Sequence, residues 1–269
     1  MLIYRYPNRV VDLEGLYQNA SCFLLLPGPS LCNYDISVLN NSRGVLYASV
    51  NNCAAKLCRP NFWFSVDHPK SFCDSIYFDP FILKFIPEEN IDKSFFVRDR
   101  NGKFQPANRL VYTLPAVLTY RRNKDFNVKR FLSEPTINWG NEGSITDELG
   151  CKGGRSVMFP AFRILYYLGI RRLFLLGCDF NMQPDKPYAF EQTKHIGGCN
   201  SNNKAYEIHN KRFIALRTEF ERKNFFIYNC TKPSGLTAFD YKSYDEALSY
   251  CTREIPKKID LQNYYGSET

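Results

Sequence analysis

The sequence lacks the patterns that mark several large classes of proteins. It has no run of about 18 apolar residues, so it predicts no membrane-spanning helix. The first residues, MLIYRYPNRVVDLEG, lack the charged, apolar and small-residue succession of a signal peptide, and we therefore expect none. There is no GxxxxGK[ST] or GxGxxG loop, which excludes two common nucleotide-binding fingerprints, and no zinc-finger or RNP motif of a nucleic-acid-binding module.

Residues that bind metals or form disulfides are present, but they follow no pattern. The three histidines have no regular spacing, and no D-x-D motif exists that would clamp a divalent metal on a diphosphate, so we expect no metal site. The ten cysteines include no CxxC pair, and Cys53 and Cys58 have no second pair at zinc spacing. Because the cysteines are scattered, we expect free thiols in a reducing, cytoplasmic environment rather than a disulfide framework.

The composition favours one globular domain with an anionic partner. The 269 residues are 44% hydrophobic, which suits a single domain over 1–269 with a sizeable core. The net charge is +8, and Lys and Arg gather in two stretches, 119–131 and 209–223. Such stretches are typical of a surface that meets a nucleotide, a nucleic acid or an acidic glycan, or of an ordinary solvated surface. The sequence does not decide between a monomer and a homo-oligomer.

The first part of the chain predicts a parallel α/β sheet. Apolar runs at 22–26, 44–51 and 61–67 predict three buried strands, separated by short segments of helical or turn character. Strands that alternate with helices over short links are typical of a parallel sheet. Residues 1–20 indicate a peripheral entry segment, and 70–140 follow no period that assigns them to elements.

The second half predicts regular elements around one long polar segment. A helix is expected from near Ser156 to Gly169, and a buried strand follows over 171–180. The Gly- and Asn-rich segment 181–205 predicts a flexible lid. The expected elements after it are an amphipathic helix at 205–224, a strand at 225–230 and a loop at 231–236.

Polar residues and glycines stand where the predicted strands end. The five segments are Gly28–Ser30, Asn51–Asn52, Asp67–His68, Gly177–Asp179 and Thr231–Ser234. Because ligands of open parallel sheets bind at the carboxyl ends of the strands, we expect these segments to share one edge and to form a site. Each segment alone has a structural interpretation as well: the PGPS stretch as a plain turn, and Asp67 or Asp179 as a cap.

Two further features carry two interpretations each. His209, in a helix of charged and apolar residues, and His195, in the polar segment, are either surface residues or catalytic groups. Gly153–Gly154, directly before a helix, is either a plain loop or a place where backbone N–H groups favour an anion.

Taken in order, the motifs resemble one superfamily: GPSL, an Asn at the second strand end, GG-S before a helix that ends in LG, then hhhhGxDF and YAF. They are similar to the glycosyltransferase family 42 sialyltransferases and their relatives, which include motility-associated flagellin-glycosylation factors and archaeal pterin diphosphokinases. The resemblance spans most of 22–240, with a poor match in the middle. It implies a Rossmann-like parallel sheet flanked by helices, with a flexible lid over a nucleotide site.

The resemblance also implies roles for single residues. His209 would be the general base, and Tyr188 would stabilise the leaving phosphate together with backbone donors near Gly28 and Ser156. No cofactor or metal is implied, because the nucleotide sugar is a co-substrate. The nucleotide-binding residues, including those that strand ends add, are Gly28, Pro29, Ser30, Asn51, Asp67, Ser156, Gly177, Asp179, Pro233 and Ser234.

The chain departs from the family at three positions. The family has an Asn where this chain has Pro27, and a strand-end Asn of the family is replaced here in the region of Asp67. The family's second lid tyrosine corresponds to Asn181 in this chain. These departures leave the donor sugar and its base open.

Together, these patterns predict an inverting, metal-independent, nucleotide-sugar-dependent glycosyltransferase. The acceptor would be a hydroxyl of a glycan or, because of the basic stretch 119–131, of a hydroxymethylated base in viral DNA. One alternative is ATP-dependent diphosphate transfer to a pterin-like alcohol, which would need Mg²⁺. The other is a nucleotide-binding module without catalytic activity.

Overall fold

The computed structural model describes residues 3–42, 44–53, 58–99, 101, 103–191 and 196–253. The strands are β1 (Ile3–Arg5), β2 (Arg9–Val11), β3 (Ser21–Leu25), β4 (Leu46–Val50), β5 (Phe62–Phe64), β6 (Leu83–Pro87), β7 (Ser94–Arg98), β8 (Phe104–Leu110), β9 (Val117–Tyr120), β10 (Arg122–Asn123), β11 (Ile137–Asn138), β12 (Arg172–Leu176) and β13 (Phe226–Asn229). The α-helices are α1 (Ser37–Asn41), α3 (Asp74–Phe78), α4 (Met158–Tyr167), α5 (Ile196–Arg222) and α6 (Tyr244–Arg253).

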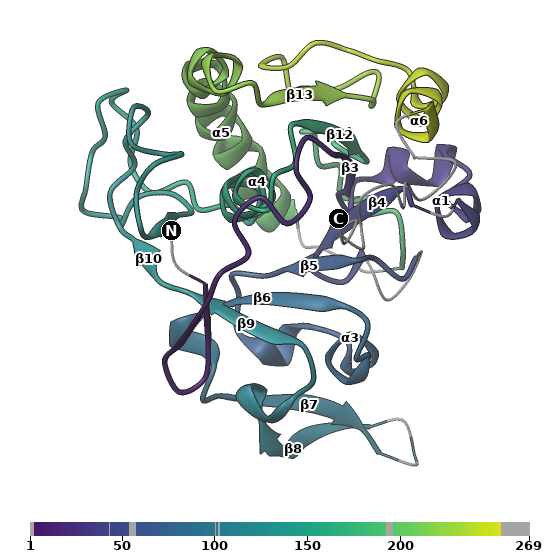
Figure 1. Ribbon diagram of the computed structural model, residues 1–269, viewed down its shortest axis with the longest axis vertical. Coiled ribbons are helices and arrows are strands. Elements are labelled where there is room, and N and C mark those ends of the chain that lie inside the picture. Colours follow the sequence, from purple (N-terminus) through teal and green to yellow (C-terminus); the bar gives the residue numbers. More distant parts are fainter. Residues whose placement is uncertain are drawn as a thin grey trace, which may run out of the picture.

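Within these residues, nine strands form one sheet in the order β13-β12-β3-β4-β5-β6-β9-β1-β2. The strands from β13 to β9 are all parallel to their neighbours, and β1 and β2 extend the sheet antiparallel. The predicted α/β class with a parallel sheet flanked by helices is thereby confirmed (Figure 1).

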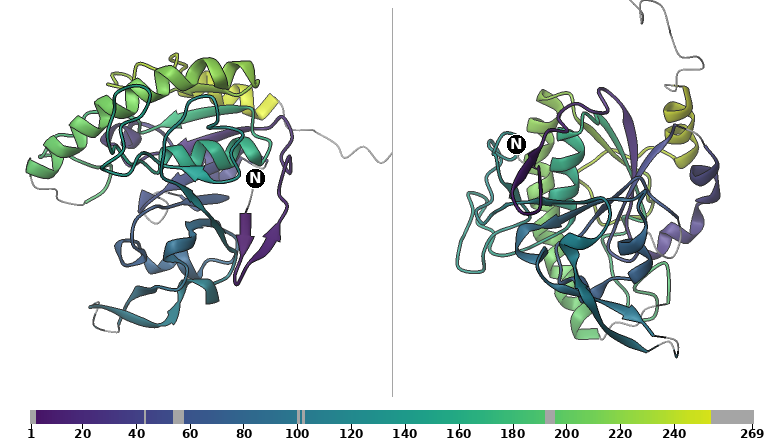
Figure 2. Two further views of the ribbon diagram at one scale, coloured as in Figure 1. Left: turned by 90° about the vertical axis from the view of Figure 1, so that its left-hand side faces the viewer. Right: turned by 60° about the horizontal axis from the view of Figure 1, so that its bottom comes forward.

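The strands are apolar on both faces because helices cover both sides of the sheet. In β3, Cys22 and Leu24 belong to a core shared with α4 and α5, whereas Phe23 and Leu25 belong to a core shared with α1 and α6. Such two-sided burial explains why the strand sequences are continuous apolar runs instead of alternating ones. A third apolar cluster packs α3 and the β7–β8 hairpin, which lies at the bottom of Figure 1 and of the left view of Figure 2.

The order of the strands creates a switch point. The chain starts the parallel sheet at β3, adds β4, β5, β6 and β9 on one side, and then returns to place β12 on the other side of β3. In sheets of this kind, the loops that leave the two central strands diverge, and a ligand crevice opens between them. The fold therefore places the segments after β3 and β12 at a binding edge.

Two segments differ from the sequence prediction. Within the stretch 181–205, residues 181–191 are irregular and residues 196–205 form the first turns of α5, whereas His195 lies outside the described residues. The Asn203 side-chain amide makes two hydrogen bonds to the backbone of Met182. Its Oδ1 accepts from Met182 N at 2.8 Å, and its Nδ2 donates to the Met182 carbonyl at 3.1 Å. These tertiary bonds offset the low helix propensity of Gly and Asn. Residues 1–20, expected at the periphery, contribute β1 and β2 to the sheet.

All ten cysteines lie in described parts of the chain, and none of them forms a disulfide. Among the described residues, no helix is long and apolar enough to cross a membrane.

Candidate functional site

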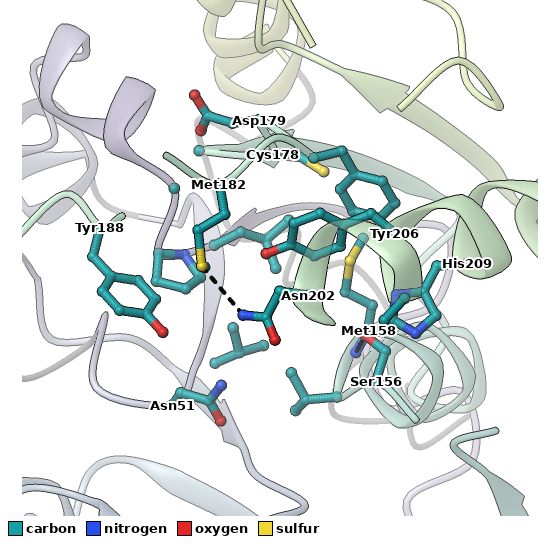
Figure 3. A pocket seen from close by; sticks show the side chains of 18 of the residues that line it. Asn51, Ser156, Met158, Cys178, Asp179, Met182, Tyr188, Asn202, Tyr206 and His209 are labelled. Atoms are coloured by element: carbon teal, nitrogen blue, oxygen red, sulfur yellow. Dashed lines mark hydrogen bonds between the residues drawn. The ribbon is translucent and has the colours of Figure 1, made fainter. Parts of the chain in front are cut away.

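A pocket of about 370 Å³ opens at the switch point, where the segments after β3, β4, β5 and β12 meet the start of α4 and one face of α5 (Figure 3). The predicted site residues that line it are Gly28, Pro29, Asn51, Asp67, Ser156, Gly177, Asp179, Tyr188 and His209. Ser30 and Ser234 lie beside it and bind residues of its wall. Four of the five segments that we expected at one edge thus contribute to its wall.

Gly28 and Asp179 join the two central loops of the sheet. The backbone N–H of Gly28 donates to the Gly177 carbonyl at 3.0 Å, and the Ser30 hydroxyl donates to Asp179 Oδ2 at 2.8 Å. A Cβ at residue 28 would collide with the Asp179 carboxylate and with the Gly177 carbonyl. Glycine is therefore required at position 28 by the neighbouring loop.

Burial raises the pKa of Asp179, and the hydrogen bonds from Ser30 oppose the shift. Ser234 has a related structural role. Its hydroxyl donates to the Cys178 carbonyl at 2.5 Å and accepts from Leu236 N at 3.0 Å, which ties the loop after β13 to the end of β12.

Asn51 follows β4 in a left-handed conformation, with φ of 52°. Its N–H donates to the Phe64 carbonyl at 3.2 Å, and its own carbonyl accepts from Trp63 Nε1 at 2.7 Å. The side-chain Oδ1 is buried and has no hydrogen-bond partner among the residues that the structure describes. Because a buried amide oxygen without a partner is costly, this atom is a candidate to accept a hydrogen bond from a ligand. Asp67, after β5, is exposed at the same side of the pocket.

Ser156 marks the start of α4. Its hydroxyl accepts from Met158 N at 3.2 Å, and its own N–H donates to the Trp139 carbonyl at 2.8 Å. The N–H groups of Gly28 and Ser156 are thus both bound to carbonyls of the chain itself. The prediction that backbone donors near these residues bind the leaving phosphate is therefore wrong for these two N–H groups.

A buried ion pair fixes the turn before α4. Arg212, fully buried on α5, donates from Nε to Asp147 Oδ2 at 2.8 Å. Its Nη1 donates to the carbonyls of Gly153 and Gly154, both at 2.8 Å. The glycine pair has φ of 59° and 63°, a region that favours glycine. The charged head of Arg212 thus sets where the pocket wall at Ser156 lies.

His209 projects from α5 at the pocket wall beside Ser156 and Met158 (Figure 3). Only 4% of the residue is exposed, and among the described residues neither ring nitrogen makes a well-formed hydrogen bond. The backbone groups of Gly154 and Arg155 lie close enough to favour the protonated ring, which opposes the effect of burial. The rings of Phe159, at 5.7 Å between centroids, and of Tyr206, at 6.3 Å, surround it. Burial, and secondarily the charge of Arg212, lowers the pKa of His209 to about 4. The imidazole is therefore neutral at neutral pH.

This burial predicts that acid destabilises the protein through His209. The folded-state pKa of about 4 lies below the unfolded value of about 6.5, so the unfolded chain takes up the proton first. The stabilisation is complete above about pH 6.5 and is lost as the pH falls toward 4, by about 3 kcal/mol in total. Urea unfolding at about pH 7 and pH 4.5 should show a smaller loss for His209→Asn than for the native chain. His68→Asn, which changes an exposed histidine, should keep the native loss; equal losses in all three would contradict a buried neutral His209.

Tyr188 lies across the pocket from His209 (Figure 3). It belongs to the segment after β12, which is attached to the loop after β3 because Ala189 N donates to the Pro27 carbonyl at 2.9 Å. The Tyr188 ring stacks on Phe190 with 5.6 Å between centroids and an interplanar angle of 6°. Its position on the pocket wall is compatible with the predicted role toward a leaving phosphate.

Sequence reasoning missed two groups of the pocket. Tyr206 and Asn202 precede His209 by three and seven residues on α5, a helical spacing that puts all three on one face. The Tyr206 ring stacks on Phe180 with 4.8 Å between centroids, and burial raises its pKa. Arg155, between the glycine pair and Ser156, is the other missed residue. The helical spacing around His209 was a signal for the first group, had α5 been predicted at its full length.

Among the described residues, no group of three or more His, Cys, Asp or Glu side chains is placed to hold a metal ion. The absence of a metal site stays a prediction.

No family model matches the chain, and no curated protein matches its sequence. Among solved structures, the MAf glycosyltransferase from Magnetospirillum magneticum AMB-1 is similar to it, with a TM-score of 0.44 and 13% sequence identity. The alignment covers 94% of this chain and 36% of that one, so the chain spans about a third of the length of that protein. A likeness this distant does not extend an activity from one protein to the other.

Proposed function

We propose that the chain is a nucleotide-sugar-dependent glycosyltransferase whose active site is the pocket between β3 and β12. The observation that carries the proposal is His209, which is buried at the pocket wall and makes no well-formed side-chain hydrogen bond within the described part of the chain. A neutral imidazole is suited to take a proton from a reacting hydroxyl. The resemblance to family 42 glycosyltransferases in the sequence supports the same role for this residue.

The proposed reaction is a single displacement with inversion. The acceptor hydroxyl oxygen forms a bond to the anomeric carbon, and the bond from that carbon to the nucleotide phosphate oxygen breaks. The hydroxyl proton passes to a ring nitrogen of His209, and the electron pair of the broken bond stays on the phosphate. A negative phosphate beside His209 would raise the low pKa of the imidazole toward the working pH. Tyr188 would donate its hydroxyl hydrogen to the departing phosphate.

The segment 181–191 would shield the reaction from water. It carries Tyr188 and is held to the first turns of α5 by the bonds between Met182 and Asn203. Excluding water matters because water competes with the acceptor for the donor sugar. We propose that this segment and the start of α5 close over the bound donor.

A glycan hydroxyl is the acceptor that the charge distribution favours. The arginines of both basic stretches are paired with carboxylates of the chain itself, which reduces the positive charge that could follow phosphates to that of the four lysines in these stretches. The pairs are Arg121 with Glu88, Arg122 with Glu142, Arg130 with Glu134, Arg212 with Asp147, Arg217 with Asp240 and Arg222 with Glu219. Tracking of DNA needs unpaired cations along its path.

Thermal stabilisation by a nucleotide panel tests the proposal. CMP, UDP, GDP and ATP would each be added with Mg²⁺ or with EDTA, and duplex DNA with hydroxymethylated bases would be a separate arm. We expect a selective shift with one pyrimidine or guanine nucleotide that EDTA leaves unchanged. Incubation with the matching nucleotide sugar and a panel of glycans should then give a product heavier by one sugar in mass spectrometry.

Other outcomes would replace the proposal. A shift with ATP that requires Mg²⁺ would indicate diphosphate transfer, and stabilisation without any product would indicate a binding module. A product on DNA would overturn the glycan acceptor, and no shift with any nucleotide would overturn the site.

A further inference from the structure

The pocket wall beside His209 carries a cation that the proposed mechanism has not used. Arg155 lies directly before Ser156 and is exposed at the pocket. It is the one Arg or Lys among the described residues that line the pocket, whose other charged members are Asp67 and Asp179. In the described part of the chain, the Arg155 guanidinium makes no hydrogen bond or ion pair. It is therefore free to bind an anion.

A second guanidinium stands behind the same wall. Arg122 lies over the ring of Trp139, 4.4 Å from its centroid, and Trp139 lines the pocket. The Arg122 side chain is 8% exposed, and only its Nη1 is bound, to Glu142 at 2.7 Å. Its Nε and Nη2 are buried without partners, as is Trp139 Nε1. Burial lowers the pKa of Arg122; Glu142 and Glu89 oppose this shift, and Arg155 adds to it.

The backbone offers no substitute at these positions. The N–H of Gly28 is bound to Gly177, that of Ser30 to Asp179, and that of Ser156 to Trp139. An oxyanion in the pocket cannot bind these three N–H groups. The start of α4, a ten-residue helix whose N-terminus lies at the pocket, offers few N–H donors, because Met158 N is bound to the Ser156 hydroxyl and Pro160 has none. The helix N-terminus still contributes positive potential, and His209 lines the pocket beside it.

We propose that Arg155 binds the phosphate of the nucleotide, with Arg122 and the start of α4 adding positive potential behind it. The inference rests on the proposed function and names the side chain that would balance the negative charge of the departing nucleotide phosphate. The planar guanidinium can donate two parallel N–H bonds to two phosphate oxygens. Negative charge grows on the phosphate as the bond to the sugar breaks, so Arg155 acts both in binding and in the reaction.

The test compares nucleotides with and without their phosphate. Arg155→Gln removes the charge at similar length, and Arg98→Gln removes the same charge on β7, outside the pocket. Calorimetry would measure the Kd of the nucleoside monophosphate selected by the panel, of its nucleoside, and of inorganic pyrophosphate. We expect Arg155→Gln to weaken the monophosphate and pyrophosphate by about 10- to 100-fold and to leave the nucleoside unchanged. Arg98→Gln should change none of the three, and Arg155→Lys should recover part of the loss.

The outcomes separate this inference from the proposed function. If sugar transfer occurs and Arg155→Gln binds the monophosphate as tightly as the native chain, Arg155 is not the phosphate ligand although the function stands. If pyrophosphate binding depends on Arg155 and no donor sugar is transferred, the anion site stands and the function fails. If Arg155→Gln loses only affinity for an acidic glycan such as a glucuronide, the bound oxyanion is a carboxylate, which overturns the assignment to phosphate.

Discussion

Replacing His209 with asparagine is expected to lower the turnover number for sugar transfer by about 10²- to 10⁴-fold, the usual value of general-base catalysis. Asparagine is a small polar side chain that cannot take up the proton of the acceptor. The Kd of the donor should stay within about twofold, because the proposed nucleotide contacts lie with Arg155 and Tyr188. Single-turnover rates with saturating donor, together with calorimetry of donor binding, measure the two quantities.

The control is His68→Asn, the same replacement at an exposed histidine. His68 caps a short turn by accepting from Lys70 N at 3.2 Å, and it does not line the pocket. It should keep the native rate. A His209→Asn protein that folds, binds donor and transfers sugar at the native rate would show that another group is the base.

Replacing Asp147 with asparagine is expected to lower the free energy of unfolding by about 3–5 kcal/mol, because it leaves the buried Arg212 without a counter-charge. Both side chains of the pair have 0% exposure, so water cannot screen the uncompensated cation. The amide can still accept the N–H groups of Leu149 and Cys151, which the carboxylate binds now. Urea unfolding at neutral pH would measure the loss.

A matched control exists on the same helix. Arg217 pairs with Asp240 at 2.6 Å, but their side chains are 37% and 65% exposed. Asp240→Asn should therefore cost less than about 1 kcal/mol. Similar losses for the two variants would mean that burial does not govern the strength of the Arg212 pair.

The sheet and its binding edge were accessible from the sequence for a physical reason. The strands are buried on both faces, so β3 and β12 appear as continuous apolar runs that end in glycine and polar residues. Parallel connection then forces the ends of such strands to one edge, whatever their order in the sheet. Asn51, Asp67 and Asp179 could be expected there together without knowledge of any side-chain contact.

The remaining parts depend on contacts that no local pattern encodes. The first turns of α5 contain glycines and asparagines of low helix propensity, and their helical conformation is supported by the hydrogen bonds of Asn203 to the backbone of Met182. Gly28 looks like a residue that admits a ligand, but its missing side chain makes room for Asp179. Arg155 has no sequence signal of its own. Its importance rests on the absence of other cations in the pocket, which only the assembled structure shows.

The continuity of α5 has a consequence for how the chain tolerates change in length. Three residues of this one helix have different roles. Asn203 holds the segment after β12, His209 faces the pocket, and Arg212 fixes the turn before α4. One residue inserted between Asn203 and His209 would rotate everything beyond it by about 100° relative to Asn203. His209 and Arg212 would then no longer face the pocket and the turn before α4 while Asn203 contacts Met182, even though every side chain was retained. The number of residues along this helix is as much a part of the site as their identity.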